Sequence, residues 1–245
     1  MKYLAIITAR MTSSRLPGKV MMKIKNTPII KILIDRLRKS KLITSIAVST
    51  TTNNSDDILV NYLKNKKIKF FRGSEKDVTK RVIQTSNYFK AKNIVLVTGD
   101  CPLIDPNIVD QCIRTFDKNN TDFVTNVNIK TFPDGMDVQV FKSNTLKKSY
   151  KKITQKKEFE HVTLNLRRTT NKEKIINIIA PTNMNFPQVG LTLDEINDFI
   201  LIKKIITHFW KKNKKFFTCF EILEYLSSNK NLIKINSNVK RKGDK

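Results

Sequence analysis

Short apolar runs and amphipathic stretches alternate along the first 117 residues of this 245-residue chain. The runs 3–7 and 93–97 have no polar alternation, which predicts strands that are buried on both faces. Between such runs, apolar residues recur at helical spacing, as in the stretch that Pro28 opens. This alternation predicts an α/β fold in which parallel strands are joined by right-handed crossovers and covered by helices on both faces. The expected strands are 3–7, 45–49, 68–71 and 93–97, and the expected helices are 28–37, 56–64, 77–89 and 106–117.

The second half of the chain is less regular. We expect strands at 123–125 and 137–141 around a turn at 133–135, a polar helical stretch at 143–168, and strands at 175–179 and 188–193. Asp194 is expected to cap a helix over 195–209, and a last helix is expected over 220–226. The length allows one large domain or two small ones. Because no internal repeat or long linker divides the chain, we predict one domain, 1–245, with an inserted arm at about 127–181 and a mobile charged tail over 240–245.

The formal net charge of +26 has two interpretations. A basic face is the usual sign of nucleic-acid binding. Alternatively, a general excess of Lys and Asn overlies a protein that handles small anions. The charge is spread along the whole chain, and few lysine clusters alternate with aromatic residues as a base-stacking surface requires. We favour the second interpretation, which predicts no nucleic-acid partner.

The cysteines and the amino terminus indicate the environment. Cys101, Cys112 and Cys219 are far apart and form no C-x-x-C motif, so reduced thiols are expected rather than a disulfide framework or a zinc site. The first residues lead directly into a strand, without the long apolar stretch of a signal peptide, and no segment has the length of a membrane span. We therefore expect a soluble cytoplasmic protein with no membrane partner.

A basic loop, residues 9–19, follows the first strand. It contains Arg10, Arg15 and Lys19, three hydroxyl side chains and a Pro-Gly turn. Loops at the carboxyl ends of parallel strands form the ligand crevice of α/β folds. Two guanidinium groups, one ammonium group and free backbone N–H groups can bind a polyphosphate there. The alternative is a solvated turn that only joins a strand to a helix.

Two acidic turns could complete such a site. Asp100 follows the run 93–97 and Asp194 follows the run 188–193, so both carboxylates could share one Mg²⁺ ion, which prefers oxygen ligands. Each has a plain alternative, because Asp100 can simply end a strand in a turn and Asp194 can stabilise a helix amino terminus. Glu160 and His161 are more simply surface residues of a polar helix, and Cys101 more simply a packing residue, since no partner base is visible.

Taken together, these motifs resemble the cytidylyltransferases of the spore-coat polysaccharide biosynthesis protein F type, which are related to CMP-3-deoxy-manno-octulosonate and CMP-acylneuraminate synthetases. The likeness implies a nucleotide-diphosphosugar-transferase-like (Rossmann-like) three-layer sandwich with a mostly parallel central sheet. It covers nearly the whole chain, and the basic loop is its most specific part. The matching segments are 6–10, 16–20, 72–75 with Asp77 and Arg81, 98–106, 134–138, 160–163, 191–195 and 235–239.

The resemblance implies roles for individual residues. Arg10, Arg15 and Lys19 would bind the triphosphate, with the backbone at Ala9 facing the base. Asp100 and Asp194 match a pair of metal-binding aspartates. The residues implied in recognition of the pyrimidine nucleoside are Arg72, Gly73, Ser74 and Arg81. The sequence departs from the family pattern at Thr12, at Gln139 and at the pair 196–197. The first departure could alter the flexibility of the basic loop, and the second concerns the contacts with the acceptor sugar.

The implied reaction transfers CMP from CTP to a hydroxyl of an acidic sugar, with Mg²⁺ as cofactor. Arg15 and Lys19 would hold the leaving pyrophosphate, and Asp100 would act with the metal. The partners are then CTP and a small sugar, and the arm could pair with its counterpart in a homodimer. Two other functions stay open: a glycosyltransferase that uses a finished nucleotide sugar, and a basic protein that binds nucleic acid.

Overall fold

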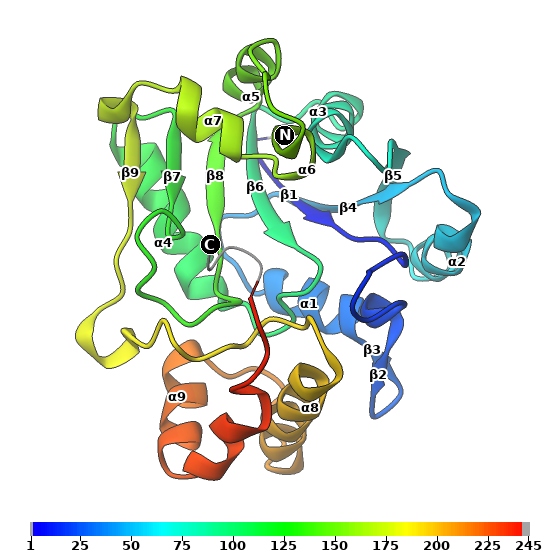
Figure 1. Cartoon of the computed structure of the whole chain (residues 1–245), viewed down its shortest axis with the longest axis vertical. Coiled ribbons are helices and arrows are strands. Elements are labelled where there is room, and N and C mark those ends of the chain that lie inside the picture. The colour runs from blue at the N-terminus through cyan, green and yellow to red at the C-terminus, as the bar shows by residue number, and fades with distance from the viewer. Residues whose placement is uncertain (1, 242–245) are drawn as a thin grey trace.

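The computed structural model describes residues 2–241, which form a seven-stranded sheet with helices on both faces (Figure 1). The strand order is β5-β4-β1-β6-β8-β7-β9. The four strands from β5 to β6 are mutually parallel, β8 is antiparallel to both of its neighbours, and β9 is parallel to β7. The strands are β1 Tyr3–Thr8, β4 Ser45–Thr51, β5 Lys69–Gly73, β6 Asn93–Thr98, β7 Phe123–Thr125, β8 Gln139–Lys142 and β9 Ile175–Asn177, and a separate ribbon pairs β2 Lys23–Ile24 with β3 Thr27–Pro28.

Alternate side chains of β1 enter two different cores, which explains why this strand is apolar throughout. Tyr3, Ala5 and Ile7 pack in one cluster, and Leu4 and Ile6 in the other. The first core is covered by α1 Ile29–Leu37, α2 Asp57–Asn65, α4 Pro106–Lys118, α8 Ile196–Lys211 and α9 Cys219–Ser227. The second is covered by α3 Val78–Tyr88, α5 Ser143–Tyr150 and α7 Leu164–Thr169. The predicted α/β sandwich with a mostly parallel sheet is confirmed.

The helical stretch expected over 143–168 is wrong as a single helix. It forms α5, the short α6 Lys157–Glu160, and α7. The buried Glu158 carboxylate accepts hydrogen bonds from the backbone N–H groups of Thr154 and Gln155 at 2.9 and 3.1 Å and pairs with Arg168 at 2.8 Å. The Glu158 side chain therefore stabilises a turn between α5 and α6, inside the stretch that was expected to be one helix.

The strand expected over 188–193 is also wrong. Its only ladder contact within the described chain is an isolated bridge between Asp134 and Gly190. The partner of this segment is the turn at 133–136, which is too short to continue a ladder. The cap of α8 is displaced by one residue, since Glu195 rather than Asp194 is the N-cap and forms a capping box with Asp198. The Asp194 carboxylate is therefore free to face away from the helix.

The expected arm, 127–181, supplies β8 and β9 to the sheet and helices α5 to α7 to one face. In the part of the chain that the structure describes, no helix is both long and apolar enough to cross a membrane. All three cysteines are buried free thiols. Of the expected tail, Lys240 and Arg241 are described and contact the body of the protein, whereas 242–245 lie outside the described residues. Short 3-10 helices are at Lys19–Met21, Asn54–Asp56, Lys172–Lys174, Thr182–Met184 and Lys230–Asn236.

Candidate active site

A pocket of about 400 Å³ opens where β1 and β6 end. Most of the predicted site residues line it: Ala9, Arg10, Arg15, Lys19, Arg81, Asp100 and Asp194. They come from segments nearly 190 residues apart in sequence. The backbone brings the two acidic turns together, because the N–H of Leu193 donates to the carbonyl of Asp100 at 2.8 Å.

The basic loop closes on itself beside this pocket. The N–H of Gly18 donates to the Met11 carbonyl at 2.8 Å, and Gly18 has a φ of 72°, a conformation that favours glycine. The N–H of Met11 donates to the carboxylate of Asp56 at 2.7 Å. Internal backbone bonds and one buried aspartate therefore define the shape of the loop.

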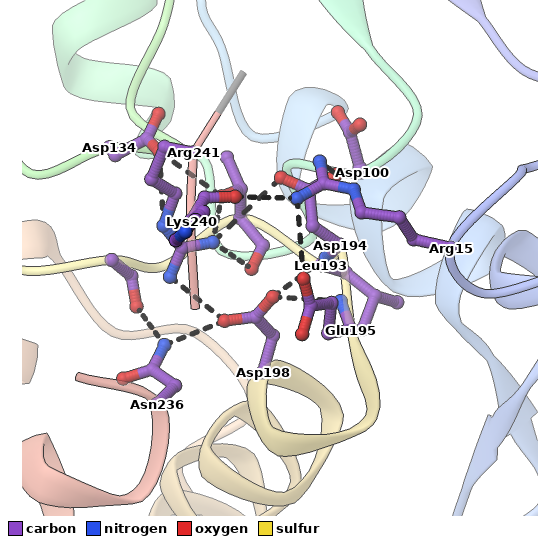
Figure 2. A network of polar contacts seen from close by, with 12 residues as sticks. Arg15, Asp100, Asp134, Leu193, Asp194, Glu195, Asp198, Asn236, Lys240 and Arg241 are labelled. Atoms are coloured by element: carbon purple, nitrogen blue, oxygen red, sulfur yellow. Dashed lines mark hydrogen bonds and ion pairs between the residues drawn. The ribbon is translucent and has the colours of Figure 1, made fainter. Parts of the chain in front are cut away.

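The Lys19 side chain joins the two carboxylates that the sequence indicated. Its Nζ lies 3.0 Å from Oδ2 of Asp100 and 3.2 Å from Oδ1 of Asp194, and it donates to the Leu193 carbonyl at 2.6 Å. Arg15 contacts the same Asp194 oxygen at 2.8 Å and lies 3.6 Å from Glu195 (Figure 2). Asp100 and Asp194 therefore face a common point, where they share one cation.

The surroundings of Lys19 and Asp100 keep both side chains charged. Burial lowers the pKa of Lys19, but the charges of Asp100 and Asp194 outweigh that effect and raise it overall. For Asp100, burial alone would raise the pKa, whereas the charge of Lys19 and the hydrogen bonds from Thr98 and Lys19 lower it. Two carboxylates beside two basic side chains are suited to binding a metal–triphosphate.

The donor set of this point fits Mg²⁺. Two carboxylate oxygens converge on the position that the Lys19 ammonium group occupies, and oxygen is the ligand type that this ion prefers. Between residues 2 and 241, no group of three or more His, Cys, Asp and Glu side chains is arranged to hold a metal. Substrate phosphates and waters would then supply the other ligands, which is the usual situation for this ion. The metal role of Asp100 and Asp194 stays a prediction.

A second acidic pair lines the same pocket and was not identified as a site from sequence. Burial, followed by the charge of Asp134, raises the pKa of Asp137 to about 7. Burial is also the main cause that raises the pKa of Asp134, partly offset by Arg241. The only sequence signal was their place in the matching segment 134–138, which gave them no role. Arg241 and Thr192 also line the pocket, and no spacing pattern indicated them.

Arg81 lies at another part of the pocket wall. It is 2% exposed, and its guanidinium donates to the carbonyl of Ser74. Burial, followed by the charge of Arg10, lowers the pKa of Arg81 to about 10. A Cβ atom at Gly73 would come within 3.0 Å of the Arg81 side chain, so this glycine makes room for it. Arg10 is 3.6 Å from Glu75.

Some predicted residues lie elsewhere or have other neighbours. Arg72 is outside the pocket lining, donates to the carbonyls of Thr51 and Asn53 at 2.8 and 2.9 Å, and pairs with Asp57. Gly73 and Ser74 likewise contact Arg81 rather than lining the pocket. These nucleoside roles stay predictions. Glu160 and His161, which the sequence favoured as surface residues, line the pocket.

Two residues that depart from the family pattern have defined partners. Thr12 bonds through its hydroxyl to Glu75, and Gln139 accepts a hydrogen bond from the Thr163 hydroxyl. The first contact ties the basic loop to the segment after β5. The second ties β8 to the start of α7.

A pocket at the carboxyl ends of parallel strands, with cations beside converging carboxylates, is typical of an α/β nucleotidyltransferase-like fold. The sequence matches the cytidylyltransferase family model over residues 4–237, and the chain therefore belongs to the cytidylyltransferase family.

Individual relatives agree with this membership. Uncharacterized protein MJ1063 of Methanocaldococcus jannaschii is 35% identical over 242 residues, covering 99% of this chain and 97% of that protein. Spore coat polysaccharide biosynthesis protein SpsF of Bacillus subtilis is 30% identical over 82% of this chain and 85% of its own length. The structure of a cytidylyltransferase from Leptospira borgpetersenii superposes with a TM-score of 0.89 at 31% identity, covering 99% of each chain. A 3-deoxy-manno-octulosonate cytidylyltransferase of Geobacter sulfurreducens aligns with about half of the chain at 28% identity. The resemblance stated from sequence is confirmed.

Proposed function

We propose that this cytidylyltransferase transfers CMP from CTP to a hydroxyl of an acidic sugar and releases pyrophosphate, in the synthesis of a surface polysaccharide or glycan. The observation that carries the proposal is the convergence of Arg15, Lys19, Asp100 and Asp194 on one point of one pocket. The names of two relatives, one for spore coat polysaccharide biosynthesis and one for a 3-deoxy-manno-octulosonate cytidylyltransferase, support the sugar class.

In the proposed reaction, the acceptor oxygen forms a bond to the α-phosphorus of CTP, and the bond from that phosphorus to the β-phosphate oxygen breaks. Pyrophosphate leaves with both bonding electrons, and the proton of the acceptor hydroxyl passes to solvent water. Arg15 and Lys19 hold the leaving group, because charge neutralisation and positioning supply most of the rate in transfers at phosphorus. Arg10 and Arg81 act at the nucleotide as well.

Asp100 and Asp194 would hold Mg²⁺ in this scheme. When bound, the ion would neutralise charge on the reacting phosphates and help to orient them. The chain's own part is to aim both carboxylates at one point and to keep Asp100 ionised, which its lowered pKa favours.

A nucleotide screen tests the proposal. Pyrophosphate release is measured with CTP, UTP, dTTP, ATP and GTP, each against a panel of 2-keto sugar acids and their neutral counterparts. We expect release that requires CTP, Mg²⁺ and an acidic sugar. If a neutral sugar supports pyrophosphate release and none of the acidic sugars does, the proposed acceptor class is wrong. Tight binding of CMP- or UDP-sugars, without any release from a free triphosphate, would favour a glycosyltransferase instead.

A further inference from the structure

The carboxylate of Asp198 is wholly buried, and within residues 2–241 two segments of the chain supply its hydrogen-bond donors. Its Oδ2 accepts hydrogen bonds from the backbone N–H groups of Asp194 and Glu195, both at 2.9 Å. Its Oδ1 accepts from Nδ2 of Asn236 at 2.7 Å and from the Arg241 guanidinium at 2.8 Å (Figure 2). One side chain thus joins the turn that carries Asp194 to the end of the described chain.

Residues 236–241, here called the C-terminal segment, contact the pocket at further points. Arg241 donates to the Thr192 hydroxyl at 2.7 Å, and its guanidinium lies 3.5 Å from Asp134 and 3.8 Å from Asp194. The carbonyl of Lys240 accepts a hydrogen bond from Arg15 at 2.7 Å. The segment, drawn in red in Figure 1, returns from the α9 side of the molecule toward the sheet. It therefore contacts both the basic loop and the acidic turn.

Gly190 shows that the chain makes room for this arrangement. A Cβ atom at Gly190 would lie 1.9 Å from a terminal nitrogen of Arg241, so any other residue would displace that guanidinium. The Gly190 carbonyl also accepts from Asn236 at 2.9 Å. Arg241 uses all three guanidinium nitrogens on this chain's own side chains, which suits a fixed structural contact better than a ligand contact.

We propose that Asn236 and Arg241 are positioning residues of the active site, which hold Asp198 and, through it, the turn that aims the Asp194 carboxylate. The inference rests on the proposed metal role of Asp194. Partners that orient a metal ligand commonly change metal affinity about 10- to 100-fold when they are removed. The segment 235–239 matched the family pattern without any assigned role. The contact of Asn236 with Asp198 gives the segment a role.

Binding of Mn²⁺ alone, followed by the electron paramagnetic resonance signal of the free ion, tests the proposal without turnover. Asn236→Ala removes no charge, so we expect Mn²⁺ affinity to fall about tenfold through loss of positioning. The matched control is Asn238→Ala, the same substitution at an exposed position of the same segment, and parent affinity is expected there. As a second readout, raising Mg²⁺ should restore the rate of pyrophosphate release of Asn236→Ala at a temperature where circular dichroism shows the variant to be fully folded without the ion, because a native-state ligand would also rescue an unstable protein by mass action.

Gly190→Ala separates positioning from charge. It displaces the Arg241 guanidinium from Asp194 and Asp198. If Arg241 acted only as a positive charge, its displacement would tighten Mn²⁺ binding, whereas loss of positioning weakens it. We expect Gly190→Ala to bind Mn²⁺ more weakly than the parent. We also expect the Gly190→Ala, Arg241→Gln double variant to bind Mn²⁺ at least as tightly as whichever single variant has the lower affinity. This variant also decides the question if Asn236→Ala fails to fold, as judged by circular dichroism.

Parent Mn²⁺ affinity in Asn236→Ala, or tighter binding in Gly190→Ala, would overturn the proposal. Asp194→Asn distinguishes this from failure of the proposed function. Should Asp194→Asn also bind Mn²⁺ as the parent does, the metal role itself is wrong. Should it lose binding while Asn236→Ala keeps it, only the positioning role is wrong.

Discussion

Asp56 and the pair formed by Asp100 and Asp194 all contact the basic loop, but through different kinds of partner. Asp56 is wholly buried and, among the residues that the structure describes, accepts only from neutral donors, which are the N–H of Met11, the Thr50 hydroxyl, and the N–H and hydroxyl of Thr51. Asp100 and Asp194 are partly exposed and are held by the charged ends of Lys19 and Arg15.

This difference separates a carboxylate that maintains the shape of the loop from carboxylates whose partners can be exchanged for substrate. Neutral donors fixed in the backbone and in short side chains cannot be exchanged for a ligand, so Asp56 shapes the loop permanently. The hydrogen bonds from Thr51, Met11 and Thr50 outweigh the effect of burial and lower the pKa of Asp56, so its charge is kept as well. Long basic side chains can instead turn from a carboxylate to a phosphate when substrate arrives. We therefore expect substitutions at the two kinds of carboxylate to affect different properties.

The largest effect is expected for Asp100→Asn. Pyrophosphate release should fall roughly 100-fold or more, the size of loss seen when a charge-stabilising group is removed from an active site. Lys19 keeps Asp194 and the Leu193 carbonyl as partners, so the free energy of unfolding should change by less than about 1 kcal/mol. The measurements are initial rates and urea unfolding, with Asp122→Asn, a carboxylate paired with Lys142 on the surface, as control. A rate close to that of the control would remove Asp100 from the chemistry.

Asp56→Asn should show the opposite pattern. The new amide N–H₂ group would face either the N–H of Thr51 or that of Met11, and a backbone N–H cannot accept a hydrogen bond. An unsatisfied buried donor costs about 1–3 kcal/mol, so we expect unfolding free energy to fall by that amount. At a temperature where the variant is folded, its rate per folded molecule should stay within a few-fold of the parent. Parent stability combined with lost activity would show that the two kinds of carboxylate do not differ as argued.

Asp137 is a third kind of carboxylate, since it lies in the pocket and burial dominates its titration. Its pKa is raised from 3.8 to about 7, so between these values the folded protein holds a proton that the unfolded chain releases. Stability from this group is therefore complete at acid pH and is lost as pH rises toward 7. Asp137→Asn removes that loss, and we expect the variant to gain on the order of 2–3 kcal/mol relative to the parent between pH 5 and pH 8.

Urea unfolding at pH 5 and pH 8 measures this gain for Asp137→Asn. Asp122→Asn, the surface control, is measured in the same way. An identical pH dependence in the parent and in Asp137→Asn would show that Asp137 is ionised as readily in the folded protein as in the unfolded chain.

The sequence predicted the parallel half of the sheet well because local patterns determine it. Strands buried on both faces are uniformly apolar, and the Asp105–Pro106 helix start is a local signal that the structure confirms, with the Asp105 carboxylate accepting from the N–H of Asn107 at 2.8 Å. The antiparallel half depends on contacts between distant residues. The turn held by Glu158 and Arg168, and the pairing of Gly190 with Asp134, leave no local pattern.

The same division applies to the site. Arg15, Lys19, Asp100 and Asp194 stand in motifs dense with chemistry-bearing residues, and the structure brings them together. Arg241 stood in a charged tail that composition alone marks as solvated, and its contact with Asp198 depends on the missing side chain of Gly190. No sequence spacing encodes such a contact. Burial, which raises the pKa of Asp137, is likewise a property of the folded chain only.

The smallest effect on the reaction is expected for Arg72→Ala. This variant extends the comparison between fixed and exchangeable partners from carboxylates to a basic side chain. The resemblance gave Arg72 a nucleoside role, but its guanidinium is bound to the carbonyls of Thr51 and Asn53 and to Asp57, outside the pocket lining. Fixed partners of this kind indicate architecture, so we expect a loss of about 1 kcal/mol in unfolding free energy and a KM for CTP within about twofold of the parent.

Arg10→Ala is the matched comparison, because Arg10 lines the pocket and lies 3.6 Å from the single carboxylate of Glu75. We expect its KM for CTP to rise several-fold while its stability stays near that of the parent, since an exposed ion pair contributes little. Initial rates at varied CTP and urea unfolding of both variants give the comparison. A raised KM in Arg72→Ala with unchanged stability would mean that the contacts of Arg72 exchange for the nucleotide, and that partners outside the pocket do not exclude a role in binding.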